Sequence, residues 1–211
     1  SISNIKVWGD IERLKAPVMS KEDVNLAKGR NIPTSFVAGT TQTLDLGKIV
    51  ATSAEATWYY SGKFNYTTLT SGTGGLTPIY AQGDYNGTNT TLSITARPTG
   101  SGSTQVVVWA GGKALHATGN NANYVVGVDY IYTVVYSGGK VSLWIDDSLI
   151  VDNFDLLAAG VTNITPKFGW NPDGSSGNIS NIKVWGDLER VNPATKPEGV
   201  ANLTKEAGQI A

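Results

Sequence analysis

Aromatic rings that carry a polar edge are the residues of this chain best suited to chemistry. The 211 residues include 6 tryptophans and 9 tyrosines against 4 phenylalanines. The face of such a ring packs on apolar C–H groups, while its N–H or O–H group forms a hydrogen bond. A sugar ring presents an apolar face together with hydroxyl groups that polar side chains bind. The composition therefore favours saccharide recognition.

The spacing of the rings predicts three candidate groups. Trp58 and Tyr60 share one face of ATWYYSG, because alternate residues of a strand point the same way. Trp109 and Trp144 each face away from the valines or leucines of their own strands. The third group is expected on loops and comprises Tyr80, Asp84, Tyr85 and Asn86 in IYAQGDYNG, with Trp170, Asn171 and Asp173 in GWNPDG. The predicted carbohydrate-binding residues are Trp58, Tyr60, Asp84, Tyr85, Asn86, Trp109, Trp144 and Trp170.

A structural interpretation competes with the binding interpretation for each ring. The core of a β-sandwich needs large side chains, and a tryptophan fills such a core well. Both interpretations remain open for any single tryptophan. For the group, we expect at least two rings to line a ligand groove.

The charged residues show no pattern that is typical of catalysis. A glycoside hydrolase needs two carboxylates beside the scissile bond, yet Glu55 is the only glutamate between positions 33 and 187. His116 is the only histidine and has no nucleophile motif near it. Arg97 is the only arginine in the same span, which argues against sialic acid as a ligand. We therefore expect no catalytic residues and no enzyme.

Cofactors and several classes of partner are also disfavoured. The absence of cysteine excludes disulfides and zinc–thiolate sites. A net charge of −1 gives no attraction to nucleic acid, and no apolar run is long enough to span a membrane. We expect no cofactor. Calcium is a secondary hypothesis, because oxygen ligands occur on turns but no contiguous calcium loop is present. Those ligands are Asp84, Asn86, Asp129, Asp152 and Asp173.

Short strands separated by glycine- and asparagine-rich turns must position these residues. Hydrophobic residues make up 40% of the chain and charged residues 16%, with 25 glycines. This pattern predicts an all-β, two-sheet antiparallel β-sandwich of the jelly-roll type. The expected strands are 35–47, 55–67, 76–82, 89–97, 104–110, 113–118, 123–136, 140–151, 164–169 and 178–186. Within them, Ser137-Gly138-Gly139-Lys140 predicts a tight hairpin turn, and Asp146-Asp147 a second turn.

A duplicated segment predicts the domain organisation. Residues 2–13 (ISNIKVWGDIER) and 179–190 (ISNIKVWGDLER) differ only at Ile11 against Leu188. This identity indicates a tandem array with a period of about 177 residues. We predict a closing-strand remnant of a preceding repeat at 1–13, a linker at 14–23 and a carbohydrate-binding module at 24–190. Residues 191–211 then form a linker and the start of a following repeat or another segment of the parent protein.

The two ends of the chain leave structural alternatives open. Residues 20–29 either form a short capped helix or open the first strand of the module with VNLAKG. Residues 2–13 have the sequence of a closing strand without their own module. We expect them to stay outside the fold or to dock on a sheet edge, because residues 179–186 are tethered beside their own position.

The succession VVYSGGKVSLWIDDSLI, ITPKFGW and GNISNIKVW resembles a known fold family. It is similar to the C-terminal half of laminin-G-like, concanavalin A-like jelly rolls, over residues 124–187. The resemblance implies a lectin-type sandwich whose last strand closes the fold. Because Trp8 and Trp185 lie in the two copies of that strand, we expect both in the core. Members of the family bind sugars or proteins, so the resemblance implies no particular ligand.

A second resemblance concerns VNLAKG and ANLTKEAG, which lie one period apart. They look like the openings of carbohydrate-binding modules in the evolved distal tail (baseplate) proteins of siphophages that infect lactic-acid bacteria. This likeness implies a domain that binds bacterial cell-wall polysaccharide for phage attachment, located in the virion. Its partners would be a cell-surface saccharide and adjacent repeat modules. The alternative is a spacer repeat of a bacterial surface adhesin, with no ligand of its own.

Overall fold

The structure is a computed structural model that describes the central module. The described residues are 25–46, 56–70, 75–85, 88–97, 104–111, 113–120 and 123–186. The predicted remnant at 1–13, the linker at 14–23 and the segment 191–211 lie outside them, as does Asn86. Among the described residues there is no helix with the length and apolar character needed to cross a membrane.

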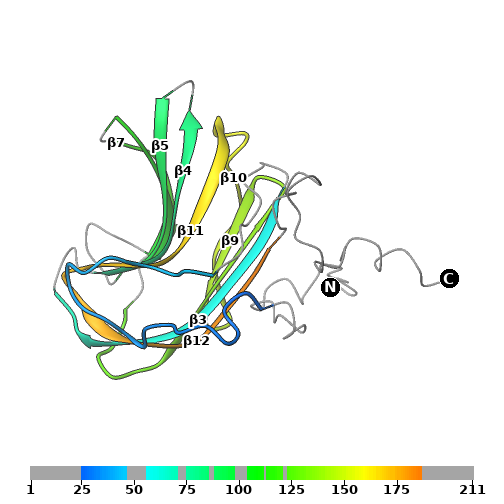
Figure 1. The fold of residues 1–211 in the computed structure, drawn as a ribbon. Helices are drawn as coiled ribbons and strands as arrows, with labels where there is room; N and C mark the ends of the chain where they lie inside the picture. The colour runs from blue at the N-terminus through cyan, green and yellow to red at the C-terminus, as the bar shows by residue number, and fades with distance from the viewer. Residues whose placement is uncertain are drawn as a thin grey trace, which may run out of the picture.

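In the described part of the chain, twelve antiparallel strands form two stacked sheets (Figure 1). Sheet I has the order β1-β12-β3-β8-β9-β10, and sheet II has the order β2-β11-β4-β5-β6-β7. The strands are β1 (Ser35–Phe36), β2 (Gln42–Thr43), β3 (Thr57–Thr68), β4 (Gly75–Tyr85), β5 (Thr88–Ala96), β6 (Thr104–Ala110), β7 (Lys113–Asn120), β8 (Tyr130–Ser137), β9 (Lys140–Ile145), β10 (Ser148–Asp155), β11 (Val161–Asp173) and β12 (Ser176–Gly186).

The predicted all-β jelly-roll sandwich is confirmed, with three corrections to the strands. The expected strand 140–151 is divided into β9 and β10 by the predicted turn at Asp146-Asp147. The expected strand 35–47 is reduced to β1 and β2, because the chain turns at Gly39, whose positive φ of 75° ends extended pairing. Residues 123–129 form a loop rather than part of β8. This loop is held against β3, since the Gly127 amide donates a hydrogen bond to the Tyr66 carbonyl.

The predicted hairpin between β8 and β9 is also confirmed. Gly138 and Gly139 both adopt positive φ, 54° and 79°, as the tight turn requires. In β9, Val141 and Leu143 face the other sheet, whereas Ser142 and Trp144 lie on the opposite face. Asp146 takes a positive φ of 51° in the second predicted turn.

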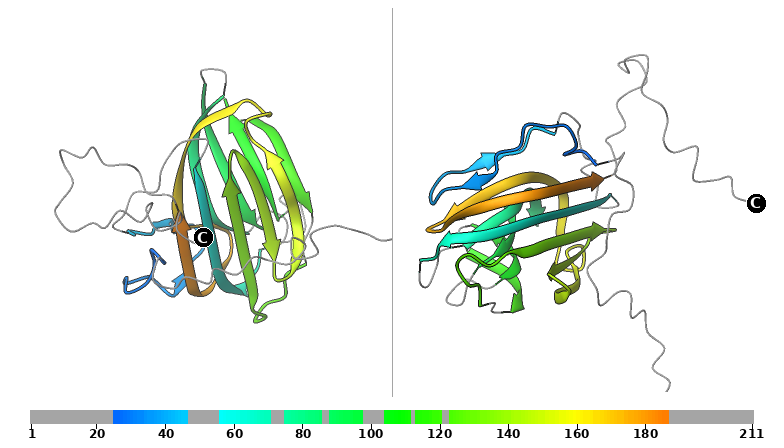
Figure 2. Two further views of the ribbon diagram at one scale, coloured as in Figure 1. Left: turned by 90° about the vertical axis from the view of Figure 1, so that its right-hand side faces the viewer. Right: turned by 90° about the horizontal axis from the view of Figure 1, so that it is seen from below.

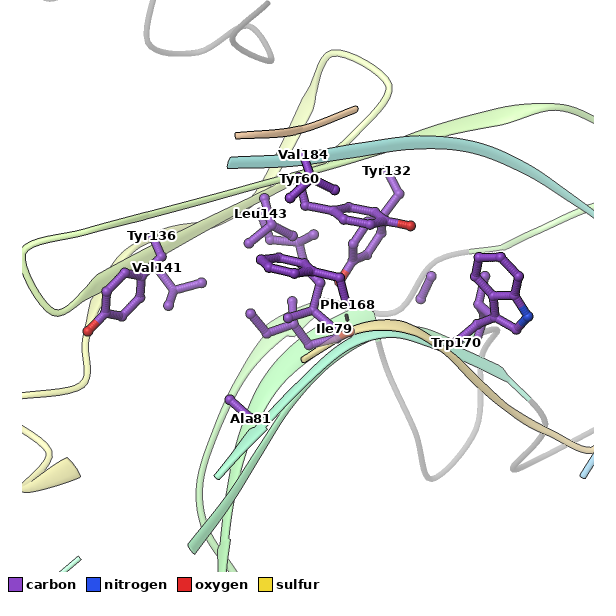
Figure 3. Close-up of a cluster of buried hydrophobic side chains, with 14 of the residues drawn as sticks. Tyr60, Ile79, Ala81, Tyr132, Tyr136, Val141, Leu143, Phe168, Trp170 and Val184 are labelled. Carbon is purple, nitrogen blue, oxygen red and sulfur yellow. Dashed lines mark hydrogen bonds between the residues drawn. The ribbon is translucent and has the colours of Figure 1, made fainter. Parts of the chain in front are cut away.

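The core between the sheets is rich in aromatic rings (Figure 3). Alternate residues of β3 are buried, including Trp58, Tyr60 and Tyr66. Two tyrosines satisfy their hydroxyls on the opposing sheet: Tyr66 donates to the Ala96 carbonyl at 2.5 Å, and Tyr132 donates to the Ile94 carbonyl at 2.7 Å. These hydrogen bonds between side chain and backbone tie sheet I to β5 of sheet II, so the sheets keep one relative position.

The buried tyrosines make the fold sensitive to alkaline pH. Burial raises the pKa of Tyr60, Tyr66, Tyr124 and Tyr132 above the ordinary value of 10.0. Their contribution to stability is therefore complete below about pH 10 and is lost as the pH rises towards their folded-state pKa. We expect the free energy of unfolding to fall above about pH 10. In a titration, these four should ionise only as the β-sheet circular dichroism disappears. Ionisation of all 9 tyrosines with an unchanged spectrum would contradict this expectation.

Candidate functional site

The outer face of sheet II is the concave surface of the molecule. Strands β4, β5 and β11 arch towards the core and bend away from it at their ends (Figures 1 and 3). Their inward residues, such as Ile79, Leu92 and Phe168, pack in the core. The residues between them in sequence therefore point outwards, into the hollow of the arch.

One row of outward residues crosses the middle of this face. Lys167 of β11 is the Cα partner of Tyr80 in β4, and Tyr80 is the partner of Ser93 in β5. The row continues to Val107 of β6 and Ala117 of β7. Side chains that are directly opposite on neighbouring strands lie within contact distance of one another. The row thus brings an ammonium group, a phenol and a hydroxyl together.

A second row lies two residues further along the strands. Thr165 of β11 pairs with Gln82 of β4, Gln82 pairs with Thr91 of β5, and Thr91 pairs with Trp109 of β6. Trp109 is 38% exposed, so its ring is accessible to a ligand. A small hollow beside this row is lined by Gln82, Gly83, Asn89, Thr90 and Thr91. We define the concave-face cluster as Tyr80, Gln82, Asn89, Thr91, Trp109 and Lys167.

The phenol of Tyr80 is held in place by the edge strand β2, which lies beyond β11. Its Oη lies 2.6 Å from Thr43 Oγ1 of β2, at hydrogen-bond distance. Close by in sequence, Thr41 Oγ1 donates to Asn171 Oδ1 of β11 at 2.9 Å. These contacts join β2 to the rest of sheet II on its outer side. The Tyr80 side chain is therefore oriented before any ligand binds, which lowers the entropic cost of binding.

Three of the predicted sugar-binding rings are core residues. Trp58 is 1% exposed, and Tyr60 and Trp170 are fully buried. Trp58 stacks on Tyr136 at a centroid distance of 5.1 Å and meets Phe168 edge-on at 5.5 Å. These rings occupy the space between the sheets and offer no surface to a sugar. They are excluded from the concave-face cluster for this reason.

Trp144 and Trp109 both face away from the core, but they lie on opposite sides of the molecule. Trp144 is on the outer face of sheet I, opposite Thr133 of β8, and is 5% exposed. Its indole nitrogen has no hydrogen-bond partner among the described residues. Trp185, which we expected in the core, is half-buried beside Tyr59 on the same outer face. Trp8 lies outside the described residues.

The predicted loop group is not assembled in the described structure. Tyr85 is half-buried at the end of β4, with its ring 6.1 Å from that of His116. The backbone of Asp84 pairs with Asn89 within the sheet, so this position is in a strand rather than a loop. Asn86 lies outside the described residues.

The proposed calcium ligands are dispersed, and two of them form ion pairs. Asp129 accepts a hydrogen bond from Asn65 Nδ2 at 2.7 Å and pairs with Lys63 Nζ at 2.5 Å. These contacts hold the pKa of the Asp129 carboxyl below its usual value. Asp173 lies 3.6 Å from Arg97. Within the described ranges, no three histidine, aspartate or glutamate side chains converge on one point.

Several members of the concave-face cluster were not among the residues predicted from sequence. Gln82, Thr91 and Lys167 belong to strands whose alternation is readable in IYAQGD, TLSITA and PKFGW. In each, an apolar residue alternates with a polar one. That signal places the polar residues outside, but pairing between strands far apart in sequence is needed to bring them together.

Comparisons with known proteins identify similar folds. No protein family matches the chain, and no curated protein is similar to it in sequence. The alginate lyase AlgAT5 of polysaccharide lyase family 7 is similar in structure, with 17% identity and a TM-score of 0.39 over 63% of this chain. Because the match covers 60% of AlgAT5, this chain spans less than two thirds of that enzyme.

Two further structures show the same kind of likeness. The family 7 alginate lyase A1-II′ has 12% identity and a TM-score of 0.45 over 70% of each chain. The carbohydrate-binding module CBM66 from Bacillus subtilis has 15% identity and a TM-score of 0.40, over 74% of this chain and 97% of its own. At these identities the likeness concerns the jelly-roll fold and assigns neither substrate nor mechanism.

These structures correct the expectation that the chain is no enzyme. Alginate lyases recur among the similar structures, so membership of this fold does not exclude catalysis. The expectation rested on the missing carboxylate pair and the missing Ser-His-Asp triad. An enzyme that works by proton transfer can instead use tyrosine, lysine or histidine as its acid or base.

Proposed function

We propose that this chain is a saccharide-binding domain whose glycan lies across the concave outer face of sheet II. The observation that carries the proposal is the in-register placement of Tyr80, Gln82, Thr91, Trp109 and Lys167 on that face. An exposed indole supplies a stacking surface, while the amide, hydroxyl and ammonium groups supply hydrogen bonds. Together these are the two kinds of contact that a sugar ring requires.

The dimensions of the cluster suit an oligosaccharide better than a single sugar. Trp109 is on β6 and Lys167 on β11, with β5 and β4 between them. At a strand spacing of about 4.8 Å, strands β6 and β11 lie about 14 Å apart. A glycan that runs across the strands would stack on Trp109 at one end and bond to Tyr80 and Lys167 at the other.

We also propose that the biological target is a surface polysaccharide bound by several modules of one polypeptide. Its support is the duplicated ISNIKVWG segment, since tandem modules raise the avidity of individually weak sites through effective concentration. The likeness of VNLAKG to the openings of phage tail modules favours a polysaccharide of the bacterial cell wall, bound for phage attachment. The competing proposal is a spacer repeat without a ligand. A spacer should bury Trp58, Trp109 and Trp144, whereas Trp109 is exposed.

Cleavage of the bound glycan is a second candidate function. Tyr80 and Lys167 are paired across β4 and β11 on the concave face, next to where the glycan would lie. A phenol and an amine can each donate or accept a proton at a sugar carbon or glycosidic oxygen. The two candidates share one binding face and differ in whether the glycan is broken.

One experiment tests binding and cleavage together. The chain is incubated with a panel of purified bacterial wall polysaccharides and with uronic-acid polymers, and binding is measured by affinity electrophoresis. We expect retardation by some polymers and not others. Size-exclusion chromatography of the same polymers after incubation then detects any shortening. A folded chain that binds no polymer, on purified glycans or on Gram-positive cells, would favour the spacer.

A further inference from the structure

Strand β12 occupies a slot that is bounded on both edges. On one side it pairs with β3, from Ser176 opposite Thr68 to Gly186 opposite Trp58. On the other side lies the segment 25–36, which runs along β12 (Figure 2). The Leu26 amide donates to the Val184 carbonyl at 2.7 Å. The slot is therefore the space between β3 and the segment 25–36, and the residues of β12 fill it.

The fit of β12 in the slot depends on four residues, of which three are buried and one has an unusual backbone conformation. Three apolar side chains point into the core, and one asparagine with a positive φ of 52° lies at the shift in register between Ser180 and Lys183. These positions are Ile179, Asn181, Ile182 and Val184. Residues 2–9 repeat residues 179–186 without a difference, so Ile2, Asn4, Ile5 and Val7 stand at the equivalent positions.

The linker between the N-terminal copy and Asn25 is long enough for the copy to reach the slot. Asn25 begins the segment that lies beside β12, and its Oδ1 accepts a hydrogen bond from the Val184 amide at 2.9 Å. If residues 2–9 filled the slot, Gly9 would lie where Gly186 lies, close to Asn25. Residues 10–24 then need to connect two neighbouring antiparallel strands. When extended they span up to about 50 Å, far more than the strand spacing of about 5 Å.

We propose that the slot between β3 and the segment 25–36 accepts residues 2–9 of the same chain in place of residues 179–186. Both arrangements bury the same types of side chain at equivalent positions of the slot. The outer face of sheet II is unchanged by the exchange. In a tandem array, a closing strand would thus be available to the module before it and to the module after it. Sheet I then provides a joint through which consecutive modules exchange a strand.

The exchanged arrangement is the minor one. Ser1 stands at the position of Asn178, so the copy lacks the side-chain hydrogen bond from Asn178 Nδ2 to Asn65 Oδ1.

A pair of matched aspartate variants of the full chain tests the exchange. Val184 is fully buried, so Val184→Asp places an unpaired carboxylate in the core when β12 fills the slot. We expect Val184→Asp to stay folded with a lowered Tm, Val7→Asp to match the wild type, and the double variant to lose cooperative unfolding. The proposal fails if Val184→Asp unfolds as completely as the double variant. It also fails if the double variant folds as well as Val184→Asp.

Disulfide trapping gives a second readout that does not depend on a destabilised variant. The chain has no cysteine, and Ser61 of β3 is the Cα partner of Lys183, whose copy is Lys6. Cα atoms paired in this way lie at distances that a disulfide can bridge. Ser61→Cys with Lys6→Cys should give an intramolecular disulfide in a minority of wild-type molecules and in most Val184→Asp molecules.

The control pair for the trap is Thr91→Cys with Lys6→Cys, because Thr91 lies on the outer face of sheet II. This pair should form no intramolecular disulfide. Peptide mapping by mass spectrometry locates the bond in each variant. The proposal would be overturned if Ser61→Cys and Lys6→Cys together gave no disulfide in either background. A disulfide formed only between two molecules would overturn it as well.

Discussion

Replacing Trp58 by alanine is expected to lower the free energy of unfolding by about 3–5 kcal/mol, as for other buried aromatic residues. Trp58 is 1% exposed and packs between Tyr136 of β8 and Phe168 of β11. Its ring therefore joins the two sheets, and its loss leaves a cavity that neither sheet can close. Since small domains are stable by about 5–15 kcal/mol, this one substitution removes a large part of the total. Urea unfolding followed by circular dichroism measures the change.

The control for this prediction is Trp58→Phe, which keeps an aromatic ring against Tyr136. We expect a loss of about 1–2 kcal/mol for this variant, because most of the packing remains. Equal unfolding midpoints for Trp58→Ala and the wild type would contradict the placement of this ring in the core.

Replacing Trp109 by alanine is expected to weaken glycan binding while leaving the free energy of unfolding almost unchanged. The indole is 38% exposed on the outer face of sheet II, next to Thr91 and in the same row as Gln82. Loss of a stacking ring should weaken glycan binding by about 1.5 kcal/mol, which corresponds to about a tenfold rise in Kd. The free energy of unfolding should change by less than about 1 kcal/mol, because little buried packing is lost. Affinity electrophoresis and urea unfolding on the same preparation measure both quantities.

Ile131→Ala is the matched control for Trp109→Ala. Ile131 is an exposed apolar residue, 48% accessible, but it lies in β8 of sheet I. Its removal should leave glycan binding unchanged. An equal loss of binding in the two variants would mean that the concave face of sheet II is not the binding face. Unchanged binding in Trp109→Ala would remove Trp109 from the site.

The contrast between Trp58 and Trp109 also separates binding from stability for the whole domain. Residues that face the core from β3, such as Tyr60, should affect the unfolding midpoint alone. Residues of the concave-face cluster, such as Gln82 and Lys167, should affect the Kd alone. If the bound glycan is also cleaved, substitutions of Tyr80 and Lys167 should lower the cleavage rate more than the affinity, because these groups can transfer protons.

The sequence by itself determined the local features of this fold. Alternation of apolar and polar residues predicted most strands, and Gly138-Gly139 predicted the hairpin between β8 and β9. Alternation also showed that Trp109 and Trp144 face away from the core side of their own strands. These features depend on the residues of one strand and its turns, so a local pattern is sufficient to predict them.

Only the tertiary structure decided which of the outward rings a ligand can reach. Trp109 and Trp144 have the same local pattern, yet one is exposed on sheet II and the other is buried on sheet I. The partnership of Lys167 with Tyr80 joins strands that are far apart in sequence. The concave shape of sheet II belongs to six strands together, because curvature accumulates from the twist between neighbouring strands. Strand order and curvature are therefore non-local, and no pattern within a single strand encodes them.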